Sequence, residues 1–214
     1  MIPLILRLKK ASHKEIAKAQ DIIVSAVYEV LFDSVLHGGT CIWRCYRGNR
    51  FSEDVDMYIA KDKARVNLLF ELFEKKGFEV ERKKISENSI YSKLNYNGTQ
   101  VRFEAIFKKS RGSLAEYESA EGNLLTVYAL TAEELIIEKV STYLKRRKIR
   151  DLYDIFFLLR HVKDVSKVKT FLNELLSRFE KPLDEKDLRV IILEGVVPTT
   201  EQMLDYIKRR IEHG

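Results

Sequence analysis

Two aspartates two positions apart, Asp54 and Asp56, are the residues of this sequence best suited to chemistry. They lie in an alternating stretch, residues 52–59, and alternate residues of a strand project to the same side. Their neighbours Val55 and Met57 are apolar, so we expect these to be buried and both carboxylates to stand on the exposed face. Two carboxylates this close repel each other, and a divalent cation relieves that repulsion. Hard oxygen ligands of this kind favour Mg²⁺ or Mn²⁺.

A glycine pair precedes the two aspartates and adds a second component to the predicted site. Gly38, Gly39 and Thr40 stand where a short extended segment, residues 34–37, runs into a helix predicted over residues 40–46. Backbone N–H groups at the start of a helix can hold a phosphate, and the hydroxyl of Thr40 is placed to assist. The alternative interpretation of the glycine pair is a tight turn with no ligand.

A third carboxylate comes from Glu104, in a strand predicted over residues 99–108. The other side of that strand is apolar: Val101, Phe103, Ala105 and Phe107. If this strand neighbours the one that carries Asp54 and Asp56, three acids gather and can bind two metal ions. One ion polarises an attacking hydroxyl and the other bridges a triphosphate. The competing interpretation is that Glu104 pairs with a surface lysine.

The chain after Thr131 contributes a predicted basic stripe. Its members recur at helical spacing: Lys139, Thr142, Arg146 and Arg150. Apolar neighbours surround Lys139, so we expect its charge to emerge at the edge of a packed surface, where it can neutralise a phosphate. Asp151 has two open interpretations, as the N-cap of the next helix or as a contributor to the site.

Composition limits the partners and the location. The 214 residues carry a net charge of +6 with a pI near 9.1, which favours a polyanionic partner such as nucleic acid or nucleotide phosphates. The excess gathers in residues 82–84, 108–111 and 145–150. No apolar run is long enough to span a membrane, and the first residues are in the wrong order for a secretory signal. We therefore expect a cytoplasmic protein with Cys41 and Cys45 as free thiols.

The periodicity predicts an α+β fold, with a mixed β-sheet core and helices followed by a helical subdomain. Helices are predicted over residues 14–32, 40–46 and 62–76, and strands over residues 52–59, 78–85, 89–96, 99–108 and 124–130. Asn97-Gly98 is a strong hairpin signal. Thr131 and Glu134 form a capping-box pattern that opens a run of four or five helices. We therefore divide the chain into an α+β core, residues 1–130, and a helical part that completes the site, residues 131–214.

In their order and spacing these residues resemble the AbiEii family of nucleotidyltransferases, toxins of abortive-infection and type IV toxin-antitoxin systems. The resemblance spans residues 35–159. It is carried by three runs: Leu36-His37-Gly38-Gly39-Thr40, then Arg50-Phe51-Ser52-Glu53-Asp54-Val55-Asp56, and later Glu138-Lys139 with Arg146 and Arg150-Asp151-Leu152-Tyr153-Asp154.

The resemblance implies a DNA polymerase β-like core that uses a divalent metal ion. Nucleotide binding would fall to Gly38, Gly39, Thr40, Arg50, Ser52, Lys139, Arg146 and Arg150. The metal would be held by Asp54, Asp56 and Glu104, and Lys139 with Asp151 would form the later catalytic motif. Family members bind nucleoside triphosphates, some transfer nucleotides to the acceptor end of tRNA, and an antitoxin often accompanies them. The chain departs from the wider superfamily at Thr40, where serine is usual, and at Glu104, where aspartate is common.

Two other functions compete with a nucleotidyltransferase. A nuclease of the PD-(D/E)xK kind also gathers acids around magnesium, but it needs a lysine two residues after its second acid. Here Ala105 and Ile106 follow Glu104, which argues against that class. The other alternative keeps the same fold as a catalytically silent module that binds nucleic acid or an antitoxin.

Overall fold

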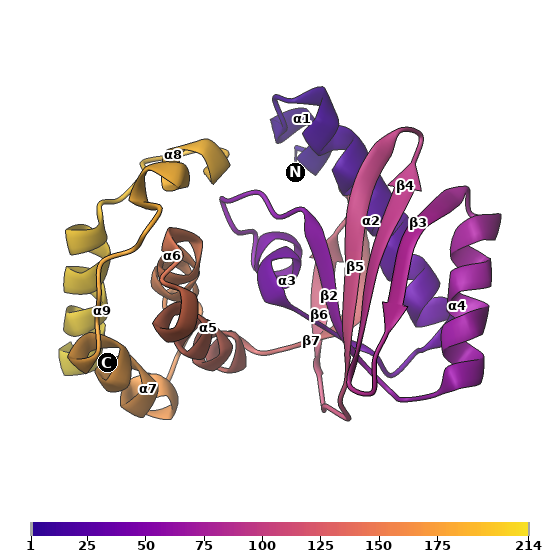
Figure 1. The fold of residues 1–214 in the computed structure, drawn as a ribbon. Helices are drawn as coiled ribbons and strands as arrows, with labels where there is room; N and C mark the ends of the chain where they lie inside the picture. Colours follow the sequence, from indigo (N-terminus) through magenta and orange to yellow (C-terminus); the bar gives the residue numbers. More distant parts are fainter. Residues whose placement is uncertain (1, 214) are drawn as a thin grey trace. The chain divides into compact units, whose positions relative to one another are not determined.

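The computed structural model describes residues 2–213, and the chain divides into two compact units. The first unit consists of Met1–Arg47 and Phe51–Ala129, and the second of Gly48–Arg50 and Leu130–Gly214. Figure 1 labels the elements. Those of the first unit are α1 (Leu4–Arg7), α2 (Ala11–Val30), β1 (Val35–His37), α3 (Gly38–Cys45), β2 (Asp54–Ile59), α4 (Lys63–Lys75), β3 (Phe78–Ile85), β4 (Ser89–Tyr96), β5 (Thr99–Phe107), β6 (Ser113–Glu118) and β7 (Leu124–Ala129).

The first unit is built on a mixed sheet with the strand order β3-β4-β5-β2-β1-β7-β6, seven strands within residues 2–213. β2 runs parallel to β5 and antiparallel to β1, and β1 runs parallel to β7. Helices α2 and α4 pack on one face, where Phe73 of α4 contacts Phe103 of β5 and Phe78 of β3. The predicted α+β class is confirmed, with more strands than the periodicity indicates.

Local signals place most of these elements. Asn97 and Gly98 both have positive φ, which is the conformation of a type I′ hairpin turn, and the predicted hairpin between β4 and β5 is confirmed. Asp62 caps α4 by accepting from the backbone N–H of Arg65, and Gly77 follows that helix with φ of +93°. The sequence pattern does not predict β6. Its last residue, Glu118, reads as a polar surface residue, but in the structure it is buried in an ion pair with Arg7.

Helix α3 begins at Gly38, two residues earlier than predicted, and is held firmly from its other end. The guanidinium of Arg44 is fully buried, donates to the carbonyl of Ala17 in α2 (3.2 Å) and pairs with Asp21. The position of the glycine turn is therefore fixed against α2.

The second unit is helical: α5 (Ala132–Arg146), α6 (Ile149–Leu158), α7 (Ser166–Ser177), the 3₁₀ turn η1 (Glu185–Asp187), α8 (Leu188–Ile191) and α9 (Thr200–His213). The capping box of Thr131 and Glu134 opens α5 as predicted. Five α-helices lie between residues 130 and 213, which confirms the predicted number. Residues 48–50, from between α3 and β2, also belong to this unit, since the amide of Leu193 donates to the carbonyl of Asn49 (2.8 Å) and Arg50 forms a β-bridge with Ile192.

No helix in the described part of the chain is long and apolar enough to cross a bilayer.

Candidate active site

The aspartate pair stands on the side of β2 that was predicted. Val55 and Met57 are fully buried beneath the sheet, while Asp54 and Asp56 are partly exposed on the face opposite α2 and α4. The register with β5 places Arg102 beside Asp54 and Glu104 beside Asp56. The predicted neighbourhood of the strands that carry the three acids is therefore confirmed.

Asp56 lies directly against the glycine turn. A Cβ atom added to Gly38 would lie 2.2 Å from Oδ2 of Asp56, which is closer than any real contact, and φ of Gly38 is +71°. Only glycine fits this position, because both the backbone conformation and the carboxylate exclude a side chain. The start of α3, where the first-turn N–H groups have no partner within the helix ladder, and the carboxylate of Asp56 thus share one small region of the surface.

Thr40 has a different role from the predicted one. Its side chain is fully buried, and its hydroxyl donates to the backbone carbonyl of Asp54. The amide of Gln20 in α2 donates to the carbonyl of Ser52 (2.9 Å) and approaches the Thr40 hydroxyl at 3.4 Å. The Thr40 side chain therefore fixes the start of β2 to α3, and a contact of its hydroxyl with phosphate is not available in this arrangement.

Asp54 has a partner that the sequence reasoning missed. Arg102 donates two hydrogen bonds to its carboxylate, Nε to Oδ1 at 2.6 Å and Nη2 to Oδ2 at 2.7 Å. Partial burial would lower the pKa of the Arg102 guanidinium, but the bonds to Asp54 and its charge raise it. The strand alternation could have revealed this residue, since Arg102 lies two positions before Glu104 and so on the same face.

The carboxylates suit a divalent ion in their chemistry. Within residues 2–213 no three His, Cys, Asp or Glu side chains are grouped tightly enough to enclose an ion by themselves. Mg²⁺ in nucleotide-dependent enzymes, however, is usually held by one or two carboxylates together with water and substrate phosphates. Asp54 and Asp56 on one face of β2, with Glu104 in register beside Asp56, are carboxylates of the kind that such a site uses.

His37 is a further residue at this face that the sequence reasoning left without a role. Its backbone is in register with Asp56 on the neighbouring strand, and its ring stacks on Tyr58 with the centroids 4.0 Å apart. The ammonium of Lys108 lies over the same tyrosine ring, 4.3 Å from its centroid. These contacts explain why Tyr58 is buried on an otherwise open face.

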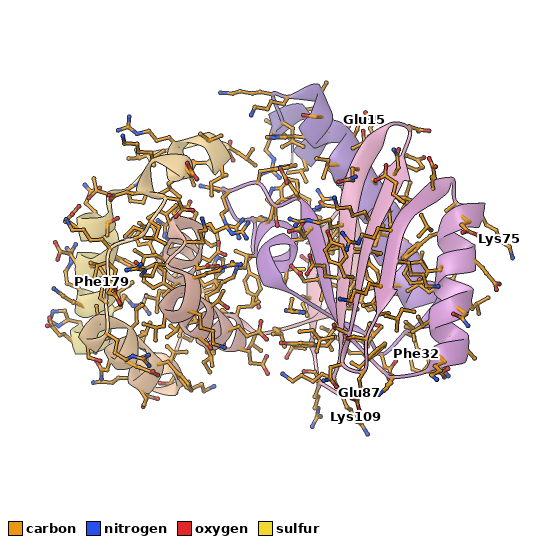
Figure 2. All side chains as sticks on the ribbon, in the orientation of Figure 1. Glu15, Phe32, Lys75, Glu87, Lys109 and Phe179 are labelled. Atoms are coloured by element: carbon orange, nitrogen blue, oxygen red, sulfur yellow. The ribbon has the colours of Figure 1, made fainter. Side chains whose placement is uncertain are left out.

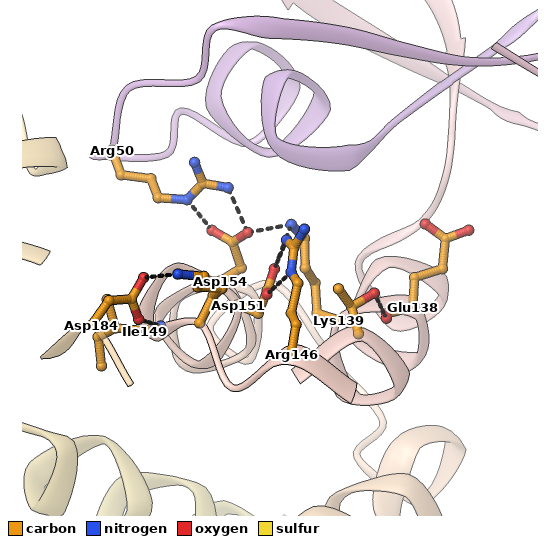
Figure 3. Close-up of polar contacts among 10 residues, drawn as sticks. Arg50, Glu138, Lys139, Arg146, Ile149, Asp151, Asp154 and Asp184 are labelled. Carbon is orange, nitrogen blue, oxygen red and sulfur yellow. Dashed lines mark hydrogen bonds and ion pairs between the residues drawn. The ribbon is translucent and has the colours of Figure 1, made fainter. Parts of the chain in front are cut away.

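The second unit brings four of the predicted site residues together in an ion-pair cluster around two buried acids: Arg50, Lys139, Arg146 and Asp151 (Figure 3). Its acids are Asp151 and Asp154 of α6, both fully buried. Arg146 donates twice to Asp151, at 2.7 and 2.8 Å, and Arg50 donates twice to Asp154, at 2.5 and 2.6 Å. The ammonium of Lys139 lies 2.6 Å from Asp154 and 3.4 Å from Asp151.

The contacts in this cluster contradict the predictions for Lys139 and for Asp151 as a helix cap. The charge of Lys139 does not emerge at a surface, because the residue is 8% exposed and lies between two carboxylates. Asp151 is not the N-cap of α6; Lys148 occupies that position, and Asp184 accepts from the first amide of the helix, that of Ile149 (2.7 Å).

The basic stripe is also interrupted. α5 ends at Arg146 and the chain turns at Arg147, which has φ of 49°. Arg150 therefore lies on α6 and does not continue the stripe. Arg50, predicted from the resemblance to bind nucleotide, is buried against Asp154.

Asp154 is the centre of this cluster. It ends the run of residues 150–154 that carries part of the family resemblance, but it was not predicted as a site residue. Burial alone would raise its pKa, but the charges of Arg50 and Lys139 hold the pKa below its usual range. The pKa of Arg146 is raised by its hydrogen bonds to Asp151. Three cations thus face two carboxylates, and the cluster keeps a formal surplus of one positive charge.

A mixed sheet with helices on one face, and a carboxylate pair beside a glycine turn on the other, defines a fold similar to that of nucleotidyltransferases. The chain belongs to the family described as "Nucleotidyl transferase AbiEii toxin, Type IV TA system", which matches residues 23–209.

Solved structures agree with this fold. JHP933 from Helicobacter pylori aligns with a TM-score of 0.66 and 17% identity, over 95% of this chain and 91% of its own. The nucleotidyltransferase toxin MenT4 from Mycobacterium tuberculosis H37Rv aligns with a TM-score of 0.66 and 20% identity, over 96% and 85%. The antibiotic-resistance factor ANT(2'')-Ia aligns with a TM-score of 0.50 and 16% identity, over 76% and 92%. No curated protein matches the sequence.

Proposed function

We propose that this protein is a metal-dependent nucleotidyltransferase that transfers a nucleotide from a nucleoside triphosphate to an acceptor hydroxyl, with RNA such as tRNA as the acceptor. The observation that carries this proposal is the position of the Asp56 carboxylate against Gly38 at the start of α3, with Asp54 on the same face. Phosphate-binding backbone and metal-binding acids are the two components that nucleotide transfer needs, and here they adjoin. Membership of a nucleotidyltransferase toxin family supports the same conclusion.

In the proposed reaction the acceptor hydroxyl attacks the α-phosphate in line. A new P–O bond forms, the bond between the α-phosphate and the β-phosphate bridging oxygen breaks, and pyrophosphate leaves with that electron pair. Glu104, beside Asp56 in the register, accepts the hydroxyl proton. The N–H groups at the start of α3 bind triphosphate oxygens, and the absence of a side chain at Gly38 keeps that approach open.

Asp54 and Asp56 would hold Mg²⁺ or Mn²⁺, assisted by Glu104. When bound, the ion supplies charge neutralisation at the triphosphate and acidifies the attacking hydroxyl. At Asp54 the ion would compete with Arg102, because each Asp54 oxygen accepts one hydrogen bond from that guanidinium.

We assign a positioning role to the ion-pair cluster around Asp151 and Asp154: it holds α5, α6 and Arg50 in place rather than taking part in the reaction. Its surplus positive charge favours a nearby anion, while its members contact each other and are mostly buried. A cognate antitoxin protein, expected for a toxin of this family, is the second partner we propose.

The test is transfer from α-labelled nucleoside triphosphates to total tRNA in the presence of Mg²⁺. We expect transfer by the unchanged protein, and a loss of roughly a hundredfold or more in Asp54→Asn and in Asp56→Asn. The matched control is Glu116→Gln, which neutralises an exposed acid on β6 of the same unit and should leave transfer unchanged. Circular dichroism should show an intact fold in all variants. Undiminished transfer by both aspartate variants would refute the assignment of the site.

The second candidate function is a catalytically silent module of the same fold. The ion pair between Asp54 and Arg102 favours it, because that pair neutralises one of the two metal-binding acids. The same experiment separates the two functions: binding of triphosphate or tRNA that survives both aspartate substitutions, without transfer by any form of the protein, supports the module.

A further inference from the structure

Four basic side chains lie together on the open face of the sheet, next to the candidate site. They are Arg82 and Lys84 of β3, Lys93 of β4 and Arg102 of β5, and we call them the basic strip. The register puts Lys93 between Arg82 on one neighbouring strand and Arg102 on the other. Alternation then places Lys84 in the adjacent row, beside Tyr91.

The strip is electrostatically unfavourable in the isolated protein. Like charges directly opposite each other on neighbouring strands destabilise a sheet. Arg102 pairs with Asp54, but no carboxylate of residues 2–213 forms an ion pair with Arg82, Lys84 or Lys93. Glu81 accepts from the amides of Asn95 and Gln100, and its charge interacts with Lys93 without forming an ion pair.

The acids and the cations of this face are separated in an ordered way. Asp54 and Asp56 are on β2, Glu104 is on β5 beside Asp56, and the unpaired cations follow on β4 and β3. Neighbouring strands are about 4.8 Å apart, so the strip leads away from β2 over roughly 14 Å. That is long enough to hold several phosphates of one chain and longer than the contact of a single triphosphate.

We propose that the basic strip binds the phosphodiester backbone of the nucleic-acid strand whose end is the acceptor in the proposed transfer reaction. The inference rests on that proposed function and names where its acceptor lies. A strand that runs over β3 and β4 arrives with its end at Glu104, Asp56 and Asp54. Tyr91 lies in the same row as Lys84 and Glu104, with the Arg82 guanidinium 5.6 Å from its ring centroid, and provides a flat surface on which a base can stack.

The experiment measures binding by fluorescence anisotropy, without nucleotide or metal, so that turnover does not enter. The probes are a labelled single-stranded RNA of about ten nucleotides and a DNA of the same sequence. We compare the full-length protein with Arg82→Gln, Lys93→Gln and the double variant. The control is Lys75→Gln, which removes one exposed charge from α4 on the other side of the sheet, where its side chain points away from the strands (Figure 2).

Loss of a cation that contacts phosphate lowers the slope of log affinity against log salt. We expect the slope to fall by about 0.7 for each single variant and by about twice that for the double variant, with no change for Lys75→Gln. Equal results with RNA and DNA would identify backbone recognition alone, and a preference for RNA would add a contact with the 2′-hydroxyl.

Two results would overturn the inference. One is a double variant that binds both probes with unchanged affinity and salt slope. The other is a protein that binds polyglutamate but neither nucleic acid, with the polyglutamate binding lost when the basic strip is changed. That result would assign the surface to an acidic protein partner. Failure of the proposed function is a separate result, because it appears as absent transfer in a protein whose RNA binding still depends on Arg82 and Lys93.

Discussion

The two aspartates of β2 look equivalent in the sequence, but their surroundings differ. Asp56 lies against the backbone of Gly38 and is in register with Glu104, while both carboxylate oxygens of Asp54 accept hydrogen bonds from Arg102. Asp56 is thus the acid most directly coupled to the glycine turn. A change at the turn should therefore act on the site through Asp56 before it acts on Asp54.

At Gly38 we predict that alanine abolishes activity and destabilises the protein. The substitution forces a non-glycine residue into the left-handed region, which costs about 1–2 kcal/mol, and it also pushes a Cβ against Oδ2 of Asp56. We expect transfer to fall to the level of Asp56→Asn. The measurements are the transfer assay and the urea midpoint of unfolding.

Gly98→Ala is the matched control for this substitution. Gly98 also has positive φ, +79°, but nothing lies within 4 Å of an added Cβ. It should therefore show the conformational cost alone, with full activity. Equal activity of the two variants would mean that the contact between Gly38 and Asp56 has no part in function.

The sequence could predict which side of a strand each residue takes, but not which residue it meets across the sheet. Alternation placed Asp54, Asp56 and Glu104 on the open face, as the structure has them. The partnership of Arg102 with Asp54 depends on the parallel pairing of β2 with β5, and the sequence does not contain that register. Thr40 shows the same limit, since its hydroxyl donates to a carbonyl on another element.

Among the elements, α5 and α6 depend on each other through charge. Lys139 and Arg146 extend from α5 to the acids of α6, and Arg50 reaches Asp154 from the segment before β2. Helical periodicity predicts both helices, but an ionic side chain reads as polar surface in such a pattern. The sequence therefore indicated exposed phosphate-binding cations where the fold buries Lys139 and Arg50, while the side chain of Arg146 is exposed as predicted.

Asp154→Asn should destabilise this network strongly. The substitution leaves the buried Arg50 and Lys139 without one of their carboxylates, and removing one partner of a buried ion pair typically costs about 3–5 kcal/mol. Glu174→Gln is the control, because it breaks the exposed pair with Arg178 in α7, which should cost less than about 0.5 kcal/mol. Urea unfolding followed by circular dichroism at pH 7 measures both differences.

The effect of Asp154→Asn should also depend on pH. The pKa of Asp154 is lowered in the folded protein, so its contribution to stability is present above the unfolded pKa, near 4, and is lost as the pH falls towards the folded pKa. The difference in unfolding free energy between the two proteins should therefore be constant from pH 7 to 5 and narrow below about pH 4. A difference that stays constant down to pH 3 would contradict the ionic origin of the effect.

The whole chain combines two cores, and its division does not follow the order of the sequence. Residues 48–50 lie between α3 and β2 along the chain, yet they belong to the helical unit. Arg50 supplies a cation to Asp154, and Asn49 accepts from the amide of Leu193. Periodicity could not reveal this, because three residues are too few to show a period and their contacts are with α6 and with residues 192 and 193.

This arrangement predicts how local unfolding spreads. Leu172 of α7 and Leu69 of α4 are both fully buried, one in each unit, and their replacement by alanine typically costs about 2–5 kcal/mol. Because each unit has its own core, Leu172→Ala should speed hydrogen exchange in α5, α6, α7 and α9, and Leu69→Ala in α4 and β3–β5. The amide of Leu193, bonded to Asn49, should follow the helical unit and exchange faster only in Leu172→Ala, as read by hydrogen-exchange mass spectrometry. Equal acceleration of exchange at that amide in both variants would contradict this prediction. It would mean that the two cores unfold together and that residues 48–50 couple the unfolding of one core to that of the other.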